Sequence, residues 1–95
     1  MPYLAYSVPG RGPQIYKLLK EVVIIGRSRE CDLPLEDTVS SRKHCQLRAW
    51  AGTYLLEDLS SKNGTYVNGE KVASAMLKDG DLISVGDWQL TYKAK

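Results

Sequence analysis

The stretch HCQLRAWAGTYLLED, residues 44–58, contains the pattern from which the fold follows. Along His44–Trp50, apolar side chains alternate with polar ones, as in a β-strand with one face toward the core and the other toward solvent. The dipeptide Ala51-Gly52 then interrupts the pattern at a place where a tight turn needs positive φ. Thr53–Asp58 is a second β-type run. The segment is therefore predicted to form a β-hairpin.

Alternation also predicts which side chains of the first strand are buried. Cys45, Leu47 and Ala49 share one face, which we expect to pack against the core. His44 and Arg48 fall on the opposite face with Gln46. His44 is thus expected to point away from Cys45.

Similar runs extend in both directions along the chain. The further predicted strands are Tyr3–Val8, Ile15–Leu19, Glu21–Ile25, Leu82–Val85 and Trp88–Tyr92. Val22–Ile25 is apolar without a break, which is typical of a central strand covered on both sides, or of one whose outer face a loop shields. Glu70–Leu77 has a helical composition, but it is short and lies between two turn dipeptides, so we predict irregular structure there. This many short strands in one small chain favours an all-β sandwich with loops at its two ends.

Length and charge exclude several classes of protein. The 95 residues, 43% apolar and 25% charged, suffice for one domain with its own core, so we predict a single domain over residues 1–95. A net charge of +2 is too small for nucleic acid or anionic membranes as general partners. No stretch approaches the ~18 apolar residues of a membrane span, and no secretory leader is visible at the N-terminus. We therefore expect a cytoplasmic protein.

The cysteines and the single histidine argue against a metal or another cofactor. Cys31 and Cys45 are expected to be reduced thiols, because a domain that buries its own core does not need a disulfide. A zinc site needs four ligands, and His44 is the only histidine in the chain. We predict no metal and no cofactor.

Polar groups interrupt the β pattern in three loops: Gly26–Arg29, Ser40–His44 and Ser60–Thr65. These loops contain arginine, lysine, serine, asparagine and glycine but no carboxylate. Arginine offers a planar fork of donors, and hydroxyl, amide and backbone N–H groups add neutral donors. A phosphate, with a charge of about −1.5 to −2 and three acceptor oxygens, suits this set better than a carboxylate does. The composition alone also fits ordinary solvated turns.

The order and spacing of these motifs resemble those of forkhead-associated (FHA) domains. The resemblance rests on Gly26-Arg27, on Ser41-x-x-His44, on the Leu56–Thr65 run with Asn63-Gly64, on Val67-Asn68-Gly69, and on the closing Leu77–Gly86 segment. It spans nearly the whole chain. It implies an FHA-like (SMAD/FHA) β-sandwich of about eleven mostly antiparallel strands. Loops at one end of such a sandwich bind phosphothreonine peptides.

The resemblance also assigns roles to individual residues. Arg27 is expected to donate to the phosphate, and the hydroxyl of Ser41 to a phosphate oxygen. Arg42 follows Ser41 at a position that often contacts phosphate in the family. Lys62 stands where many relatives have threonine and is expected to add a donor. Asn63 is expected to hydrogen-bond the peptide backbone beside the phosphothreonine.

Other residues are expected to support the site or to tune it. His44 is expected to support the loops by hydrogen bonding without touching phosphate. Gly26 and Gly64 are expected to serve backbone conformation, through close approach or positive φ. Ser28 and Ser61 lie in loops assigned to peptide specificity.

Specificity in this family usually depends on the residue three positions after phosphothreonine, which variable loops contact. The corresponding segments are Ser28–Asp32, Glu36–Ser40 and Asn68–Lys71. Because Glu30, Asp32, Glu36 and Asp37 make part of this rim acidic, we expect it to disfavour acidic residues at that peptide position.

The predicted function is therefore that of a reader or adaptor in Ser/Thr kinase signalling. No threonine precedes Thr38, so the phosphothreonine ligand is expected in trans, on a kinase, its substrate or another partner protein. An enzyme is the first alternative, but the Ser40–Lys43 S-x-x-K spacing lacks the further motifs of acyl-enzymes, and Ser41 with His44 lacks a third triad member. The stronger alternative is an interaction or assembly module that uses the same fold without phosphate.

Overall fold

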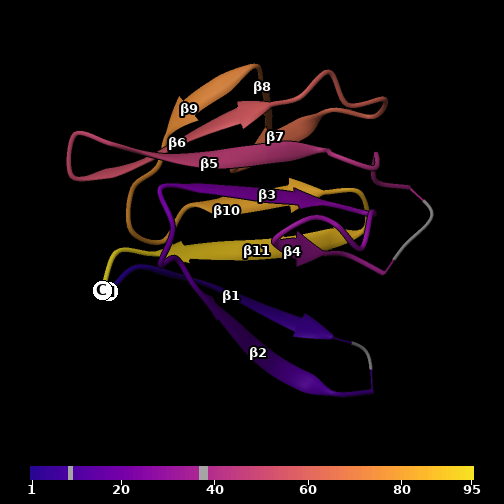
Figure 1. The fold of residues 1–95 in the computed structure, drawn as a ribbon, viewed down its shortest axis with the longest axis horizontal. Helices are drawn as coiled ribbons and strands as arrows, with labels where there is room; N and C mark the ends of the chain where they lie inside the picture. The colour runs from indigo at the N-terminus through magenta and orange to yellow at the C-terminus, as the bar shows by residue number, and fades with distance from the viewer. Residues whose placement is uncertain (9, 37–38) are drawn as a thin grey trace.

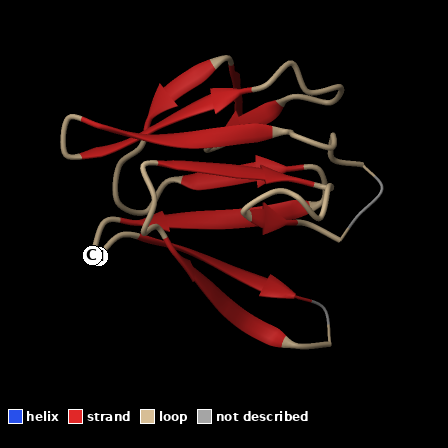
Figure 2. Ribbon diagram, viewed as in Figure 1, coloured by secondary structure: helices blue, strands red, loops and turns tan. Residues whose placement is uncertain are grey.

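The described part of the chain consists of β-strands joined by turns and loops. The computed structural model describes residues 1–8, 10–36 and 39–95, and these contain eleven strands and no helix (Figures 1 and 2). In chain order the strands are β1 (Tyr3–Val8), β2 (Gly12–Lys17), β3 (Val22–Gly26), β4 (Leu33–Pro34), β5 (Cys45–Trp50), β6 (Thr53–Asp58), β7 (Thr65–Val67), β8 (Glu70–Val72), β9 (Ser74–Met76), β10 (Leu82–Val85) and β11 (Trp88–Lys93).

The strands form two sheets. One has six strands in the order β2-β1-β11-β10-β7-β8, and the other has five in the order β4-β3-β5-β6-β9. Every pairing is antiparallel except that of β3 with β4. The expected all-β sandwich of about eleven mostly antiparallel strands is confirmed.

The core lies between the sheets and is built from alternating side chains. In β5 and β6, Cys45, Leu47 and Leu56 are fully buried, while their neighbours along each strand are at least partly exposed. In β11, Leu90 and Tyr92 are buried in the same alternating way. The other large members are Leu4, Leu18, Val23, Ile25, Leu33, Leu35, Tyr54, Val67, Leu77, Ile83 and Val85.

The predicted hairpin over residues 44–58 is confirmed. Its register runs from the pair Cys45–Asp58 to the pair Trp50–Thr53, and Ala51 in its turn has φ of 50°. Ala49, expected in the core, is exposed; it lies at the edge of the β3–β5 pairing, where its N–H donates to the carbonyl of Glu21 at 2.7 Å. The continuous apolar run of β3 is buried on one face only, at Val23 and Ile25.

The sequence-based prediction was wrong for Glu70–Leu77. This segment is not irregular but contains two short strands. β8 pairs with β7 at an edge of the six-stranded sheet, and β9 pairs with β6 at an edge of the five-stranded sheet. β2 also begins earlier than predicted, because its pairing with β1 continues to Val8 and Gly12. Strands β4 and β7, of two and three residues, were not predicted. Such short strands arise from pairing with a distant neighbour, so a local pattern does not mark them.

The polar loops meet at one end of the sandwich. The β3–β4 and β6–β7 connections and the described residues just before β5 lie on the right in Figure 1, and the C-terminus lies at the opposite end. Loops from both halves of the chain are thereby brought together. The fold thus places the three polar loops of the sequence in one region.

Candidate functional site

Backbone hydrogen bonds connect the loop after β3 to the loop before β5. The N–H of Arg27 donates to the carbonyl of Ser41 at 2.9 Å, and the N–H of Ser28 donates to the carbonyl of Arg42 at 3.1 Å. These bonds extend the β3–β5 pairing beyond the ends of both strands. Arg27 and Ser41 are thereby neighbours, although they are far apart in sequence.

Gly26 makes this close approach possible. A Cβ built on it would lie 2.8 Å from the carbonyl carbon of Arg42 and 2.9 Å from the backbone N of His44, and it would overlap the Arg42 carbonyl oxygen. Its own carbonyl accepts the N–H of Leu35 at 2.7 Å. A side chain at this position would push the two loops apart.

The Arg27 side chain is exposed and held at one nitrogen. Its Nε–H donates to the carbonyl of Ser40 at 3.2 Å. This bond orients the planar guanidinium and leaves its terminal N–H groups for an acceptor outside the protein. Arg27 is therefore a partly preorganised oxyanion donor.

The Ser41 hydroxyl lies where the three loops meet. Its Oγ accepts the backbone N–H of Lys62 at 2.9 Å. A serine hydroxyl has one hydrogen to donate, and this contact uses only a lone pair. The hydroxyl hydrogen of Ser41 can thus be donated to a bound ligand.

His44 connects the same loops from beneath. It is fully buried, its Nδ1 accepts the Ser41 N–H at 3.0 Å, and its Nε2 lies 2.8 Å from the carbonyl oxygen of Gly64. With Nδ1 accepting, Nε2 must carry the proton that is donated to Gly64. Alternation placed His44 on the face opposite the core residue Cys45, yet His44 is fully buried, because it precedes β5 and its ring is hydrogen-bonded between the loops.

A partly buried hydrogen-bond network shapes the β6–β7 loop. Asp58 Oδ1 accepts from the hydroxyls of Ser61 at 2.5 Å and Thr65 at 2.6 Å, and its Oδ2 accepts the Ser61 N–H at 3.1 Å. Ser61 Oγ also accepts the N–H of Gly64 at 2.9 Å, and Gly64 has φ of 88°. Burial acts to raise the pKa of Asp58, but the donors outweigh it and the pKa is lowered. Sequence reasoning did not identify this network, although Asp58-x-x-Ser61 is a spacing at which an aspartate caps a turn.

Asn63 and Lys62 project from this loop. The side-chain amide of Asn63 donates to the carbonyl of Val39 at 2.9 Å, which links the β6–β7 loop to the β4–β5 loop. Both Asn63 and Lys62 are exposed. Within the described residues no hydrogen bond to the Asn63 side-chain oxygen is found, so this oxygen can accept one from a ligand.

The cations in these loops are not neutralised within the described residues. The two ion pairs found there join Lys20 to Asp32 and Arg48 to Glu57. Arg27, Arg42 and Lys62 take part in neither pair, so their charges favour an anion beside these three loops.

A small cavity of about 350 Å³ adjoins Arg27. It is lined by Arg27, Arg29, Pro34, Leu35 and Glu36. Sequence reasoning did not select Arg29, because only the fold brings it to the same cavity as Arg27.

One carboxylate of the expected acidic rim is already bound elsewhere. Asp32 accepts from Lys20 Nζ at 2.5 Å and from the Ile24 N–H at 2.8 Å, and both contacts lower its pKa. Glu30 and Glu36 are exposed, and Asp37 lies outside the described residues.

The structure joins some of the expected site residues more closely than others. Hydrogen bonds connect Arg27, Ser41 and Lys62 through the loop backbones, and Asn63 follows Lys62 directly. The exposed side chain of Arg42 makes no hydrogen bond to them in the described part of the chain. The hydroxyl of Ser28 accepts the N–H of Glu30 at 3.2 Å, and that of Ser61 serves Asp58. These two hydroxyls are engaged within their own loops.

Comparison with known proteins places this arrangement in a family. The sequence profile of the FHA domain matches residues 23–86, which is about two thirds of the chain and includes all three polar loops. The chain belongs to the FHA family. The FHA match begins within β3 and ends at Gly86, after β10.

Two curated proteins are similar to this FHA chain over almost all of its length. The glycogen accumulation regulator GarA of Mycolicibacterium smegmatis is 36% identical over 91 residues, covering 93% of this chain and 58% of GarA. The oxoglutarate dehydrogenase inhibitor of Corynebacterium jeikeium is 36% identical over 91 residues, covering 93% of this chain and 63% of that protein. The chain thus spans about three fifths of the length of these relatives.

A solved FHA domain, from work on phosphothreonine-dependent FHA domain interactions, has the same fold. It superposes with a TM-score of 0.88 at 34% identity, covering 97% of this chain and 94% of that one.

In the described residues of the present chain, no helix is long and apolar enough to cross a membrane.

Proposed function

We propose that this FHA domain binds phosphothreonine in partner proteins. The observation that carries the proposal is the pairing of Arg27 with Ser41. The guanidinium of Arg27 is oriented by the Ser40 carbonyl, and the Ser41 hydroxyl is held beside the Lys62 backbone with its hydrogen still to donate. Two donors of this kind, on adjoining loops, suit an oxyanion with several acceptor oxygens.

Charge and backbone recognition support the same ligand. Arg42 is exposed on the loop before β5 and Lys62 on the β6–β7 loop, and the hydrogen bond from the Lys62 N–H to Ser41 joins these two loops. Both side chains add positive charge around the donors. Asn63 is exposed beside Lys62 and offers an amide for a peptide backbone. The phosphate thus supplies affinity, and Asn63 orients an extended peptide.

The role of the whole protein is part of the proposal. Relatives named as a regulator and an inhibitor fit a binding module better than an enzyme. We infer that residues 1–95 form one FHA domain that acts as a reader or adaptor, bound in trans to a protein phosphorylated by a Ser/Thr kinase. The free cysteines fit a reducing, cytoplasmic location. No cofactor takes part in this binding.

Titration calorimetry with phosphothreonine peptides tests the proposal. Charge-assisted hydrogen bonds contribute about 1.5–3 kcal/mol each, so Arg27→Ala should weaken binding by roughly 10- to 100-fold. Arg11→Ala, which removes the same charge from the exposed β1–β2 turn, is the matched control and should leave the affinity nearly unchanged. Peptides with phosphoserine or unmodified threonine should bind more weakly.

Two results would contradict the proposal at different points. Full affinity in a folded Arg27→Ala variant would remove Arg27 from the site. Absence of binding to every phosphopeptide by the folded wild type would favour the alternative, an interaction module that does not use phosphate.

A further inference from the structure

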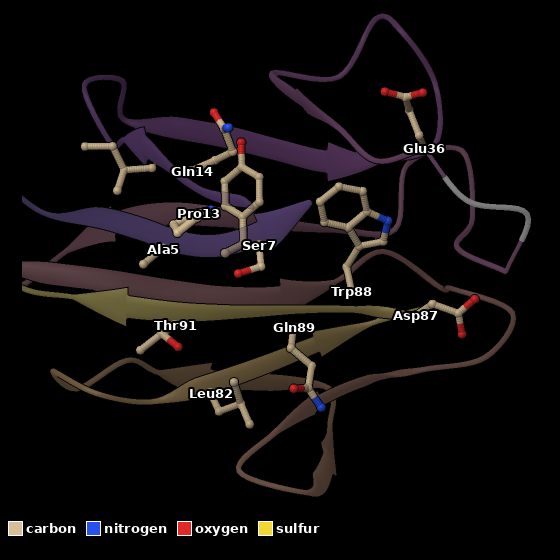
Figure 3. A pocket seen from close by; sticks show the side chains of 12 residues that line it. Ala5, Ser7, Pro13, Gln14, Glu36, Leu82, Asp87, Trp88, Gln89 and Thr91 are labelled. Atoms are coloured by element: carbon tan, nitrogen blue, oxygen red, sulfur yellow. The ribbon is translucent and has the colours of Figure 1, made fainter. Parts of the chain in front are cut away.

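A second cavity adjoins the candidate phosphate site. It has a volume of about 760 Å³ and lies among β1, β2, β10, β11 and the segment after β4. Figure 3 shows Trp88 directed toward the loop that carries Glu36, whereas Gln89 and Leu82 extend to the other side of the sheet. We call this the Trp88 cavity; its other lining residues are Ala5, Tyr6, Ser7, Pro13, Gln14, Ile15, Asp87 and Thr91.

Two aromatic rings form part of its wall. The ring centroids of Tyr6 and Trp88 are 5.7 Å apart with an interplanar angle of 59°. Both side chains are half-buried and pack against the hydrophobic core. The core therefore holds the rings in place while part of each remains accessible. The face of such a ring attracts a cation.

The charged groups of the Trp88 cavity have one sign. Glu36 is an exposed carboxylate at its wall, Asp87 has a further interaction within the protein, and the described lining includes no lysine or arginine. Carboxylates beside aromatic rings complement an ammonium or guanidinium group. An anionic side chain would meet Glu36 without a compensating donor.

Glu36 also connects this cavity to the candidate phosphate site. It lines both the Trp88 cavity and the smaller cavity that contains Arg27 and Arg29. In the free protein these arginines lower the attraction of the region for a cation. A phosphate bound at Arg27 would offset their charge and make a cation at Glu36 more favourable. The two cavities would then act together on one ligand.

We propose that the Trp88 cavity receives a lysine or arginine side chain of the partner whose phosphothreonine occupies the Arg27 site. This inference rests on the proposed function and deepens it, because it specifies the partner as a phosphothreonine segment with a nearby basic residue. Glu36 supplies the charge, and Tyr6 with Trp88 supplies the aromatic wall. The basic side chain adds more affinity in the phosphorylated ligand than in the unphosphorylated one.

A lysine scan tests the proposal. The probes are short phosphothreonine peptides with alanine at every flanking position, and derivatives in which each alanine in turn is replaced by lysine or by norleucine. Norleucine keeps the aliphatic chain of lysine and lacks its charge. By calorimetry we expect lysine at one position to bind about 3- to 10-fold more tightly than norleucine at that position.

Two variants assign this effect to the cavity. Glu36→Gln, at an exposed site, removes one charge without changing the size of the side chain, and Trp88→Leu removes the larger ring. Each should reduce the lysine-to-norleucine ratio toward one; because Glu36 also lines the cavity of Arg27, Glu36→Gln changes the phosphate affinity of both peptides, and the ratio cancels that common change. Glu30→Gln, an exposed carboxylate outside the lining, is the control and should preserve the ratio.

The outcomes separate this inference from the proposed function. Equal affinity for lysine and norleucine peptides at every position would overturn the cation site alone, because phosphopeptides would still bind. A lysine preference unchanged in both Glu36→Gln and folded Trp88→Leu would also overturn it. Failure of all the phosphopeptides to bind would refute the proposed function, and this inference with it.

Discussion

Replacing His44 by alanine should damage both the fold and the site, although His44 is not expected to touch the ligand. Its ring accepts the N–H of Ser41 at 3.0 Å and lies 2.8 Å from the carbonyl oxygen of Gly64. Alanine removes both contacts from a residue that is fully buried. An unsatisfied buried polar group costs about 1–3 kcal/mol, and the volume left by the imidazole adds a cavity term.

The two hydrogen bonds do not contribute equally. The contact with Gly64 is buried, so its carbonyl would lose its partner out of reach of water, whereas the contact with Ser41 is only partly buried. We therefore expect the free energy of unfolding to fall by about 2–4 kcal/mol. The Ser41 and Gly64 loops would also lose their common support, and phosphopeptide affinity should fall by at least about tenfold.

Urea unfolding, followed by tryptophan fluorescence, measures the first effect, and calorimetric titration of the folded variant measures the second. Lys43→Ala is the matched control, because Lys43 is the exposed neighbour of His44. An His44→Ala variant as stable as Lys43→Ala, with unchanged peptide affinity, would refute the role of His44 as the support between the loops.

Three further predictions concern the residues around the site. Gly26→Ala should destabilise the fold by more than about 1 kcal/mol and weaken binding, since its Cβ would meet backbone atoms; an urea midpoint equal to that of wild type would contradict this. Asp58 has a pKa below its ordinary value of 3.8, so its stabilising contribution is present above that pH and is lost as the pH falls through its folded-state pKa. Asp58→Asn should therefore flatten the loss of stability in acid, which thermal unfolding between about pH 5 and pH 2 measures. A slope of stability against pH equal to that of wild type would be evidence against the network with Ser61 and Thr65. Burial raises the pKa of Cys45 to about 12, so iodoacetamide should not modify it in the native protein at neutral pH; rapid labelling seen by peptide mass spectrometry would show that the core opens.

Part of the fold was predictable because its signals are local. Tyr3–Val8, Thr53–Asp58 and Leu82–Val85 coincide with β1, β6 and β10, where alternation or apolar content is clear. The hairpin turn at Ala51 was marked by the glycine that follows it. Each of these signals depends on a few consecutive residues, so no knowledge of distant neighbours was needed.

Other strands depended on partners elsewhere in the chain. β8 and β9 have three residues each, too few to show a period, and they are strands because β7 and β6 lie beside them. The composition of Glu70–Leu77, with its alanines, methionine and leucine, favours helix when read alone. Tertiary pairing overrides that preference.

The same division holds for the candidate site. The sequence alone determined the donor types, the motif order and the FHA resemblance, since residue identity and spacing are properties of the chain itself. Only the tertiary structure decided that the Arg27 N–H meets the Ser41 carbonyl, that Ser41 meets Lys62, and that Arg29 shares a cavity with Arg27. It also decided that His44 is buried beneath the loops and that Trp88 and Glu36 line one cavity. These contacts join residues far apart along the chain, and their energy is available only when two packed sheets bring the loops together.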